Sequence, residues 1–186
     1  MTPVQEIPAI LERLARLHAA RRRTDGLTDA QSVVLEYLSR ANRFSRSPSA
    51  VADYLVTTRG TASQTLKSLA MKGLMVESAP AQDKRVRRYD LTKAGEDMVR
   101  KFVPDNWAAT DLGLDLILAA LRVLLRRNLD AHQGRAFGLC QRCRHHRRTG
   151  SERYCGLLKT ALSAPEANQL CHEFAEPSPD LCECVA

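Results

Sequence analysis

The cysteines of this 186-residue chain are confined to its last 50 residues. Four of them lie within 32 residues, as one C-x2-C pair followed by two single cysteines. Thiolates bind zinc and iron–sulfur clusters, and cysteines in a chain without a secretory signal favour metal or redox chemistry over structural disulfides. We therefore expect one metal centre per subunit with four protein ligands. These ligands are Cys140, Cys143, Cys155 and Cys171.

The spacing of these ligands bears on the identity of the metal. Structural zinc modules usually bring their ligands in two close pairs, whereas here only Cys140 and Cys143 are close. Single ligands far apart in the chain favour an iron–sulfur cluster, because a cluster is larger than one ion. The expected cofactor is therefore an iron–sulfur cluster that senses redox state, iron or a diatomic gas. A structural zinc site is the alternative.

Three histidines and two further cysteines accompany this set. His145 and His172 remain open as ligands, because imidazole binds zinc and some iron–sulfur centres, whereas His146 is expected to be a basic surface residue. Cys182 and Cys184 follow two prolines in the C-terminal tail and would be spare ligands, a resolving thiol pair or free ends. Without a metal, the segment would be a thiol-rich helical extension that acts as a thiol switch.

No arrangement typical of an enzyme is present. The sequence contains no phosphate-binding Gly-rich loop and no Gly-x-Ser-x-Gly elbow. Cys140 and Cys143 have the spacing of a thiol–disulfide reductase, but they do not lie in a β-α-β pattern. We therefore expect that the chain is not an enzyme, and a disulfide-reduction assay would reveal the reductase.

A second chemistry, DNA recognition, is predicted from the middle of the chain. A proline begins a first helix there, Thr57 or Thr58 can cap a second helix, and Gly73 ends it. Two runs that read as strands then follow around a polar loop. Helix, turn, helix and hairpin in this order make a winged helix-turn-helix. The predicted elements are helices over residues 48–55 and 58–72 and strands over residues 74–78 and 86–92.

The second of these helices has an apolar side and a polar, basic side. Side chains of the polar kind reach bases and phosphates: Gln64 can make paired hydrogen bonds to adenine, and Arg59 or Lys67 can reach guanine or phosphate. The wing is basic as well, and Asp83 can hold Arg85 in an ion pair. The predicted DNA-contacting residues are Thr58, Arg59, Thr61, Ser63, Gln64, Lys67, Lys84, Arg85, Arg87 and Arg88.

These segments resemble the MarR family of bacterial transcription regulators. The shared motifs are K-G-L at residues 72–74, D-x-R at residues 83–85 and L-T-x-x-G at residues 91–95. The resemblance covers roughly residues 5–130. It implies a sequence-specific regulator that binds a double-stranded DNA operator as a homodimer formed by its terminal helices. The cysteine-rich segment departs from the family pattern.

Two further helices would complete such a dimer. Residues 4–23 place apolar side chains three and four apart, which predicts an amphipathic helix. Residues 104–134 predict a helix that is apolar almost all round, which requires cover from a second subunit or a core position within one chain. Thr28 and Gln31 have the spacing of a capping box at the start of the intervening helix. Residues 42–47 are expected to be a polar connector.

Composition agrees with this interpretation. A net charge of +7 and a pI of about 9.3 suit a polyanionic partner. An aromatic content of 5% does not favour single-strand binding by base stacking. The N-terminus lacks the apolar region of a signal peptide, and no apolar run is long enough to span a bilayer, so a cytoplasmic location is expected. The remaining alternative is a protein-interaction adaptor built on a winged helix that no longer reads DNA.

The predicted fold is mainly α with a small β-hairpin wing, a winged helix-turn-helix with dimerising terminal helices. The predicted domains are an N-terminal dimerisation helix at residues 1–27, the winged helix-turn-helix at residues 28–100, a dimerisation helix at residues 101–136, and a cysteine-rich metal-binding extension at residues 137–186.

Overall fold

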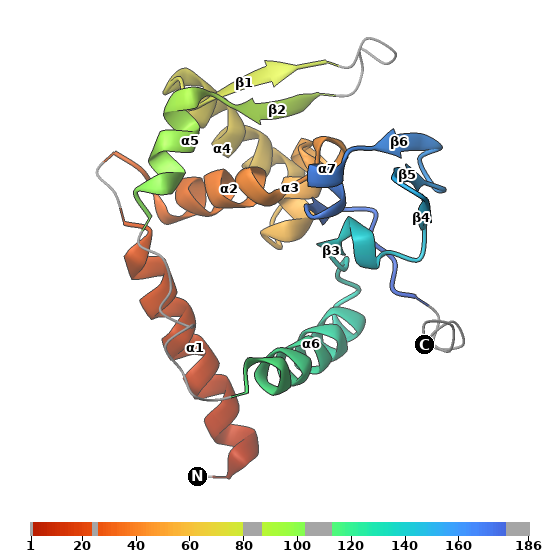
Figure 1. Ribbon diagram of the computed structural model, residues 1–186. Coiled ribbons are helices and arrows are strands. Elements are labelled where there is room, and N and C mark those ends of the chain that lie inside the picture. Colours follow the sequence, from red (N-terminus) through yellow and green to blue (C-terminus); the bar gives the residue numbers. More distant parts are fainter. Residues whose placement is uncertain (1, 24–25, 80–86, 103–112, 178–186) are drawn as a thin grey trace.

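The computed structural model describes residues 2–23, 26–79, 87–102 and 113–177. They form a helical head, two long helices outside it, and a C-terminal module beside the head (Figure 1). The head comprises α2 (Asp29–Arg40), η1 (Arg43–Ser45), α3 (Pro48–Tyr54), α4 (Arg59–Met71), β1 (Met75–Ser78), β2 (Arg88–Leu91) and α5 (Lys93–Arg100). The long helices are α1 (Pro3–Arg21) and α6 (Leu114–Ala131).

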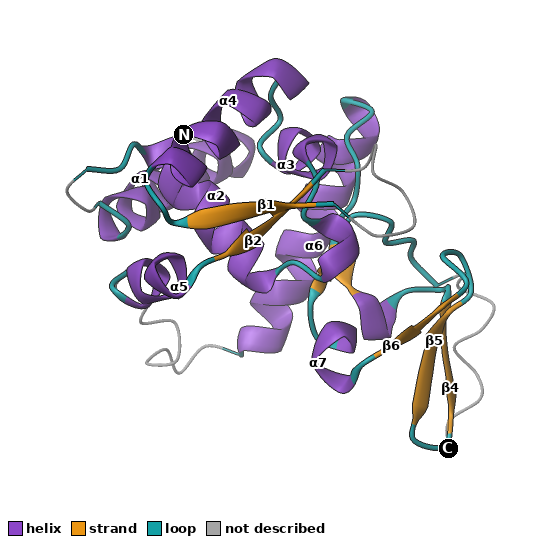
Figure 2. Cartoon of the chain, turned by 90° about the horizontal axis from the view of Figure 1, so that it is seen from above, coloured by secondary structure: helices purple, strands orange, loops and turns teal. Residues whose placement is uncertain are grey.

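The C-terminal module is built from short strands and turns. Its elements are β3 (Gly138–Leu139), η3 (Cys140–Arg142), β4 (His146–Thr149), β5 (Glu152–Cys155), β6 (Thr160–Leu162), α7 (Ala164–Ala167) and β7 (Leu170–Cys171). β4, β5 and β6 form one antiparallel sheet, which Figure 2 shows well apart from β1 and β2, and β3 pairs with β7. The expected helical extension of a metal-free segment is therefore wrong, because the chain pairs its backbone groups between strands instead.

The core of the head forms where α2, α3 and α4 meet. Tyr37 is fully buried there, and its hydroxyl donates to the carbonyl oxygen of Ser45 at 2.6 Å. The apolar sides predicted for the helices face this core, since residues three and four apart share one side of a helix. The buried core includes Val34, Leu35, Leu38, Val51, Ala52, Ala62, Leu66, Leu69, Leu74, Met75 and Tyr89.

The predicted helix ends are confirmed by their hydrogen bonds. Thr28 and Gln31 form the capping box, since each side chain accepts from the backbone N–H of the other, at 3.3 and 3.1 Å. Thr58, and not Thr57, caps α4 and accepts from Thr61 N at 3.1 Å. Gly73 follows α4 with φ +70°, a conformation that favours glycine.

The winged helix-turn-helix order predicted from the sequence is confirmed. β1 and β2 pair antiparallel with Met75 opposite Leu91 and Ser78 opposite Arg88, which makes the base of the wing. The strands are shorter than predicted, and the tip of the predicted polar loop, at residues 80–86, lies outside the described residues. Likewise α6 begins at Leu114, and residues 104–112 of the longer predicted helix are not among those described.

The packing around Gly95 explains why the L-T-x-x-G motif ends in glycine. Thr92 caps α5, accepting from Gly95 N at 3.2 Å, and its hydroxyl donates to the carbonyl oxygen of Gly73 at 2.7 Å. Thr92 N also donates to Leu74 O at 3.1 Å, which draws the start of α5 onto the end of α4. A Cβ atom at position 95 would collide with this same Leu74 oxygen. The motif therefore requires glycine for close backbone approach.

We expect Gly95→Ala to lower the free energy of unfolding by about 1–3 kcal/mol, the usual cost of overpacking a site whose neighbours cannot move. The matched control is Gly60→Ala at the start of α4. A Cβ atom there meets only Thr58 Oγ1, at 3.7 Å, and alanine favours a helix over glycine by up to about 1 kcal/mol. Urea unfolding of both variants measures the difference. Equal stability of the two would contradict this account of Gly95.

α1 and α6 carry apolar side chains that no part of the described chain covers. Neither helix has a buried residue, and Leu116 and Leu125 are 77% and 59% exposed. The amphipathic stripe predicted in α1 is present, but it faces outward, with Ile10 50% exposed. The sequence alternative of a core helix within one chain is therefore wrong for α6 as far as the described residues go, because none of them forms a core around it.

Candidate DNA interface and cysteine centre

The outward side of α4 carries free polar side chains. Arg59, Gln64 and Lys67 are exposed, and none of the three makes a hydrogen bond or ion pair with another described residue. The opposite side packs into the core through Ala62, Leu66 and Leu69. The residues that hold the helix in place are therefore not the residues that it exposes to solvent. An exposed, unpaired polar side on a fixed helix can enter a DNA groove.

Three of the remaining predicted contacts on α4 are used, at least in part, by the helix itself. Thr58 Oγ1 lies 2.9 Å from Thr61 Oγ1 while it caps the helix. Ser63 is half-buried. Thr58 and Thr61 therefore position the N-terminal turn of α4, and Arg59, Gln64 and Lys67 have longer side chains that reach further from the helix.

The two described arginines of the wing differ in their surroundings. Arg87 forms an ion pair with Glu77 on the neighbouring strand at 2.9 Å. Arg88 is half-buried, and its guanidinium lies 5.6 Å from the centre of the Phe44 ring. Lys84 and Arg85, with the predicted Asp83 partner, lie outside the described residues. Of the two, Arg87 is the one exposed beside the wing loop.

The four predicted ligand cysteines are all buried and free. Their exposed fractions range from 3% for Cys140 to 8% for Cys143. Cys140, Cys155 and Cys171 pack into one cluster with Leu162, against which Phe44 and Phe174 also pack. Residues separated by up to 31 positions in the chain are thus brought together inside the module. Cys182 and Cys184 lie outside the described residues.

Nitrogen atoms approach three of these sulfurs. Ala175 N donates to Cys143 Sγ at 3.4 Å, and Leu158 N donates to Cys155 Sγ at 3.5 Å. His146 Nδ1 lies 3.9 Å from Cys140 Sγ. Donors around a sulfur stabilise its negative form, and such contacts tune iron–sulfur centres. These nearby donors would therefore stabilise thiolates better than an apolar core would.

Burial favours the neutral thiol form of two of the cysteines, Cys140 and Cys171. Burial raises the pKa of Cys140 to about 12, with added contributions from Cys171, Cys155, Cys143 and Glu166 in that order. Burial also raises the pKa of Cys171. Cys140, Cys155 and Cys171 share one buried cluster, where low dielectric disfavours the charged thiolate. Metal binding would have to displace these protons, since thiolates are the ligands.

Within the described residues, no group of three or more His, Cys, Asp or Glu side chains is arranged to hold a metal ion. A closed zinc site needs four ligands within about 2.0–2.3 Å of one point. An iron–sulfur cluster instead distributes its cysteines over several iron atoms. The four buried thiols are therefore metal-ligand types by their chemistry, but the described side chains are not arranged around a metal ion.

The three histidines have different environments. His146 was expected at the surface, and this is wrong: it is half-buried beside Cys140, and burial with nearby Arg153 and Arg148 lowers its pKa. His172 points away from the sulfurs, with Nε2 2.7 Å from Asp53 Oδ2 on α3. His145 is half-buried. His146 is therefore the histidine nearest the thiols, and His172 belongs to the contact with the head.

Residues 42–47 form that contact, although the sequence indicated only a polar connector. Asn42 and Ser45 are fully buried. Asn42 N donates to Leu170 O at 2.9 Å, and His172 N donates to Ser45 Oγ at 2.8 Å. Backbone bonds thus hold the residues on both sides of Cys171 against the start of η1. The sequence did not predict this contact, because the partners lie more than 120 positions apart. The one local signal was an Asn and a Ser three residues apart, a spacing at which their side chains can bond to each other.

Ion pairs strengthen the same contact. Arg43 pairs with the buried Glu166 of the module at 2.9 Å and also donates to Ala161 O at 3.1 Å. Asp53 on α3 accepts from His172 and lies 3.6 Å from Arg135. The cysteine module is therefore joined directly to the helix-turn-helix of its own subunit.

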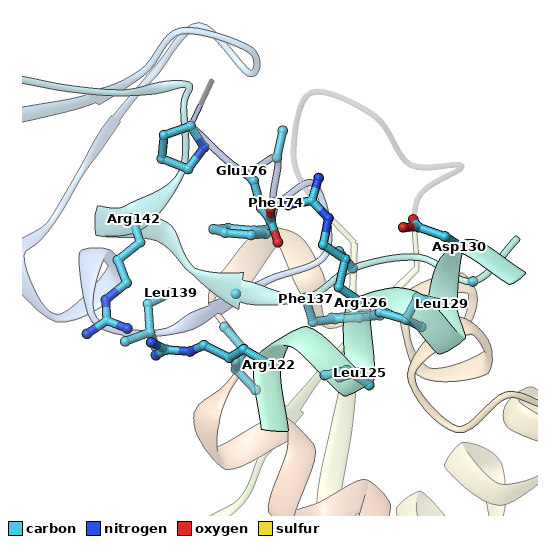
Figure 3. A pocket seen from close by; sticks show the side chains of 16 residues that line it. Arg122, Leu125, Arg126, Leu129, Asp130, Phe137, Leu139, Arg142, Phe174 and Glu176 are labelled. Atoms are coloured by element: carbon cyan, nitrogen blue, oxygen red, sulfur yellow. Dashed lines mark hydrogen bonds and ion pairs between the residues drawn. The ribbon is translucent and has the colours of Figure 1, made fainter. Parts of the chain in front are cut away.

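A pocket of about 800 Å³ separates the module from α6 (Figure 3). Arg126 of α6 forms an ion pair with Glu176 across it. Arg122 of α6 and Arg142 of the module line the pocket, and neither has an ion-pair partner in the described part of the chain. The expectation that the module sits simply at the end of α6 is thus incomplete. It follows α6 in the chain, but its packing is with the head.

Comparison with known proteins agrees with this fold. Residues 25–86 match the model of the MarR family. The fold resembles a MarR transcriptional regulator from Methanosarcina mazei, at 19% identity and a TM-score of 0.53 over 69% of this chain and 97% of that one. It also resembles MepR of S. aureus in a complex with DNA, at 21% identity and a TM-score of 0.55 over 68% of this chain and 96% of that one. No curated protein matches the sequence.

None of the helices in the described segments is long and apolar enough to cross a membrane.

Proposed function

We propose that this chain is a MarR-type transcription regulator that binds double-stranded DNA as a homodimer through α4. The observation that carries the proposal is the exposed, unpaired polar side of α4. It lies in the segment that matches the MarR family, on a helix anchored by its opposite side. A resembling protein of the same fold was determined in complex with DNA. The net charge of +7 suits a polyanionic partner.

In this proposal α4 enters the major groove of each half-site. Gln64 has an amide that can bond adenine at two positions, and Arg59 and Lys67 supply guanine or phosphate contacts. Arg87 supplies phosphate contact from the wing once it exchanges its partner Glu77 for DNA. The exposed apolar sides of α1 and α6 supply the dimer contact. The setting proposed for such a regulator is cytoplasmic.

The test of this placement is Gln64→Ala. We expect the variant to lose discrimination at one base position of each half-site, by about 1–3 kcal/mol, because a well-made paired contact to one base is removed. The measurement is selection of binding sites from random duplexes by wild type and variant, followed by titration at fixed salt. The control is Met71→Ala, since Met71 is 83% exposed in the last turn of the same helix. An unchanged site preference for Gln64→Ala would contradict the placement.

For the cysteine module the proposal is an iron–sulfur cluster held by Cys140, Cys143, Cys155 and Cys171. Its support is the burial of all four thiols in one module and the N–H donors near the sulfurs of Cys143 and Cys155. A cluster supplies reversible one-electron or assembly chemistry, which suits a sensor of redox state, iron or a gas. The residues themselves exclude water from the thiols and hold them beside the head.

Zinc is the alternative occupant, and it would change what the module does. Zinc has no redox chemistry, so it would act as a fixed brace between the module and the head. A metal-free thiol switch would instead depend on disulfide formation among the same cysteines. Acid-labile sulfide that accompanies iron distinguishes the cluster from both.

A further inference from the structure

We propose that the β4–β5 hairpin of the C-terminal module is a second DNA contact. Arg148 and Arg153, at the tip of this hairpin, bind phosphate groups of the duplex that flanks the site read by α4. The inference rests on the proposed DNA-binding function. It extends that function to a part of the chain outside residues 25–86, the segment that matches the MarR family.

The first observation is a dense set of cations on the module. The segment from Arg142 to Lys159 holds six Arg and Lys residues but a single acidic residue, Glu152. None of the six cations forms an ion pair with another described residue, and all are exposed except the half-buried Arg153. A surface of unpaired cations fits a polyanionic partner. The six are Arg142, Arg144, Arg147, Arg148, Arg153 and Lys159.

The second observation is that two of these cations face each other across the hairpin. Arg148 of β4 lies directly opposite Arg153 of β5, so both side chains project from the same face of the sheet. Glu152 lies opposite Thr149, and alternation along the strand puts it on the other face. Like charges in directly opposite positions destabilise a sheet. An anion that binds both guanidinium groups would remove this cost.

The third observation is that both guanidinium groups are turned toward the tip of the hairpin. Arg148 Nε donates to Gly150 O at 3.1 Å, and Arg153 Nη1 donates to Ser151 O at 3.4 Å. Gly150 and Ser151 form the two-residue turn between the strands. A guanidinium carries five N–H donors, so most donors of each group remain available. Arginine binds phosphate through two parallel hydrogen bonds, which suits such a pair.

The position of the hairpin favours DNA as the polyanion. Figure 2 shows the β4–β5 hairpin projecting from the body of the molecule, and Figure 1 shows its sheet on the side of the head toward which β1 and β2 extend. Arg88 of the wing and Arg43 of η1 both lie against the ring of Phe44, at 5.6 and 4.6 Å from its centre. Arg43 also donates to Ala161 O of β6, the strand that pairs with β5. Contacts thus lead from the wing to the hairpin without a break.

A phosphate contact at this position would add affinity and orientation without sequence information. The turn and its two flanking residues, Thr149 to Glu152, include no Asn, Gln or Arg that could read a base edge at the tip itself. Duplex length beyond the selected site, rather than its sequence, should therefore reveal the contact.

The experiment uses the full chain and an operator that the wild-type protein has selected from random duplexes. One duplex ends at the selected site, and a second extends it at each end by unrelated sequence of one helical turn, about 10 base pairs. We expect the wild-type protein to bind the longer duplex more tightly. The double variant Arg148→Gln/Arg153→Gln should lose most of this advantage. The ratio of the two dissociation constants isolates the hairpin, because α4 reads the same site in both duplexes.

Salt dependence is the second measurement. Each arginine acts in both subunits, and each lost phosphate contact lowers the slope of log affinity against log salt by about 0.9. Arg148→Gln alone should therefore lower the slope on the longer duplex by about 2, and leave the slope on the shorter duplex unchanged. Thermal unfolding should show the double variant to be at least as stable as the wild type, because a like-charge pair has been removed.

The matched control is Arg127→Gln, which removes the same charge from an exposed position on α6. It should keep the wild-type advantage of the longer duplex. An unchanged advantage in the double variant would overturn the inference, and so would equal weakening on both duplexes. Arginine-dependent binding to phosphatidylglycerol vesicles, with no preference for the longer duplex, would assign the hairpin to a membrane surface instead. Failure of the wild-type protein to select any duplex would overturn the proposed function itself.

Discussion

Each of the variants Cys140→Ser, Cys143→Ser, Cys155→Ser and Cys171→Ser is expected to purify without iron or acid-labile sulfide, whereas the anaerobic wild-type protein is expected to contain both. The reason is that all four thiols are buried in one module, and serine, with its hydroxyl, does not replace a thiolate ligand. Metal analysis, sulfide analysis and the visible absorption spectrum measure the effect. Cluster loss is expected to weaken the module's hold on the head as well, because metal binding and folding are coupled in small domains.

The controls for this series are Cys182→Ser and Cys184→Ser, which are expected to retain iron and sulfide. Operator affinity should then differ between holo and apo dimers by about five- to 150-fold, the range of a typical coupling free energy. Stoichiometric zinc without sulfide would overturn the sensor function but not the ligand assignment. Metal retained by Cys171→Ser would contradict the assignment itself.

Leu121→Glu on α6 is expected to convert the dimer into a monomer and to weaken operator binding severely. Leu114, Leu118, Leu121 and Leu125 lie on one side of α6, and each is more than 40% exposed in the single chain. Burying one leucine contributes about 1.5–3 kcal/mol, and a two-fold interface contains each residue twice. Losing two such contacts and burying two carboxylates should raise the dimer dissociation constant by at least about two orders of magnitude.

Analytical ultracentrifugation and operator titration measure both parts of this expectation. The control is Arg127→Gln, which lies on a different side of the same helix and is also exposed. It should stay dimeric, with at most a modest change in affinity from the lost charge. A dimeric Leu121→Glu protein would show that this side of α6 does not form the subunit contact.

Local chemistry determined much of the head. Thr28, Thr58 and Gly73 mark helix ends through groups within a few residues of themselves, and α2 and α4 display apolar residues at helical spacing. These signals need no knowledge of the rest of the chain. The order of helix, turn, helix and hairpin could therefore be predicted. The four cysteines were selected in the same way, by their type and density, and their role as ligands stays a prediction.

Contacts between distant segments decided the rest. Asn42 and Ser45 looked like parts of a polar loop, yet they are buried because residues 170–172 cover them and bond to them. His146 lies opposite Cys155 only because β4 pairs with β5. The sequence predicted a module beyond α6, whereas packing joined it to the helix-turn-helix. Periodicity and spacing describe one segment at a time, and burial of a polar residue depends on which other segment supplies its hydrogen bonds.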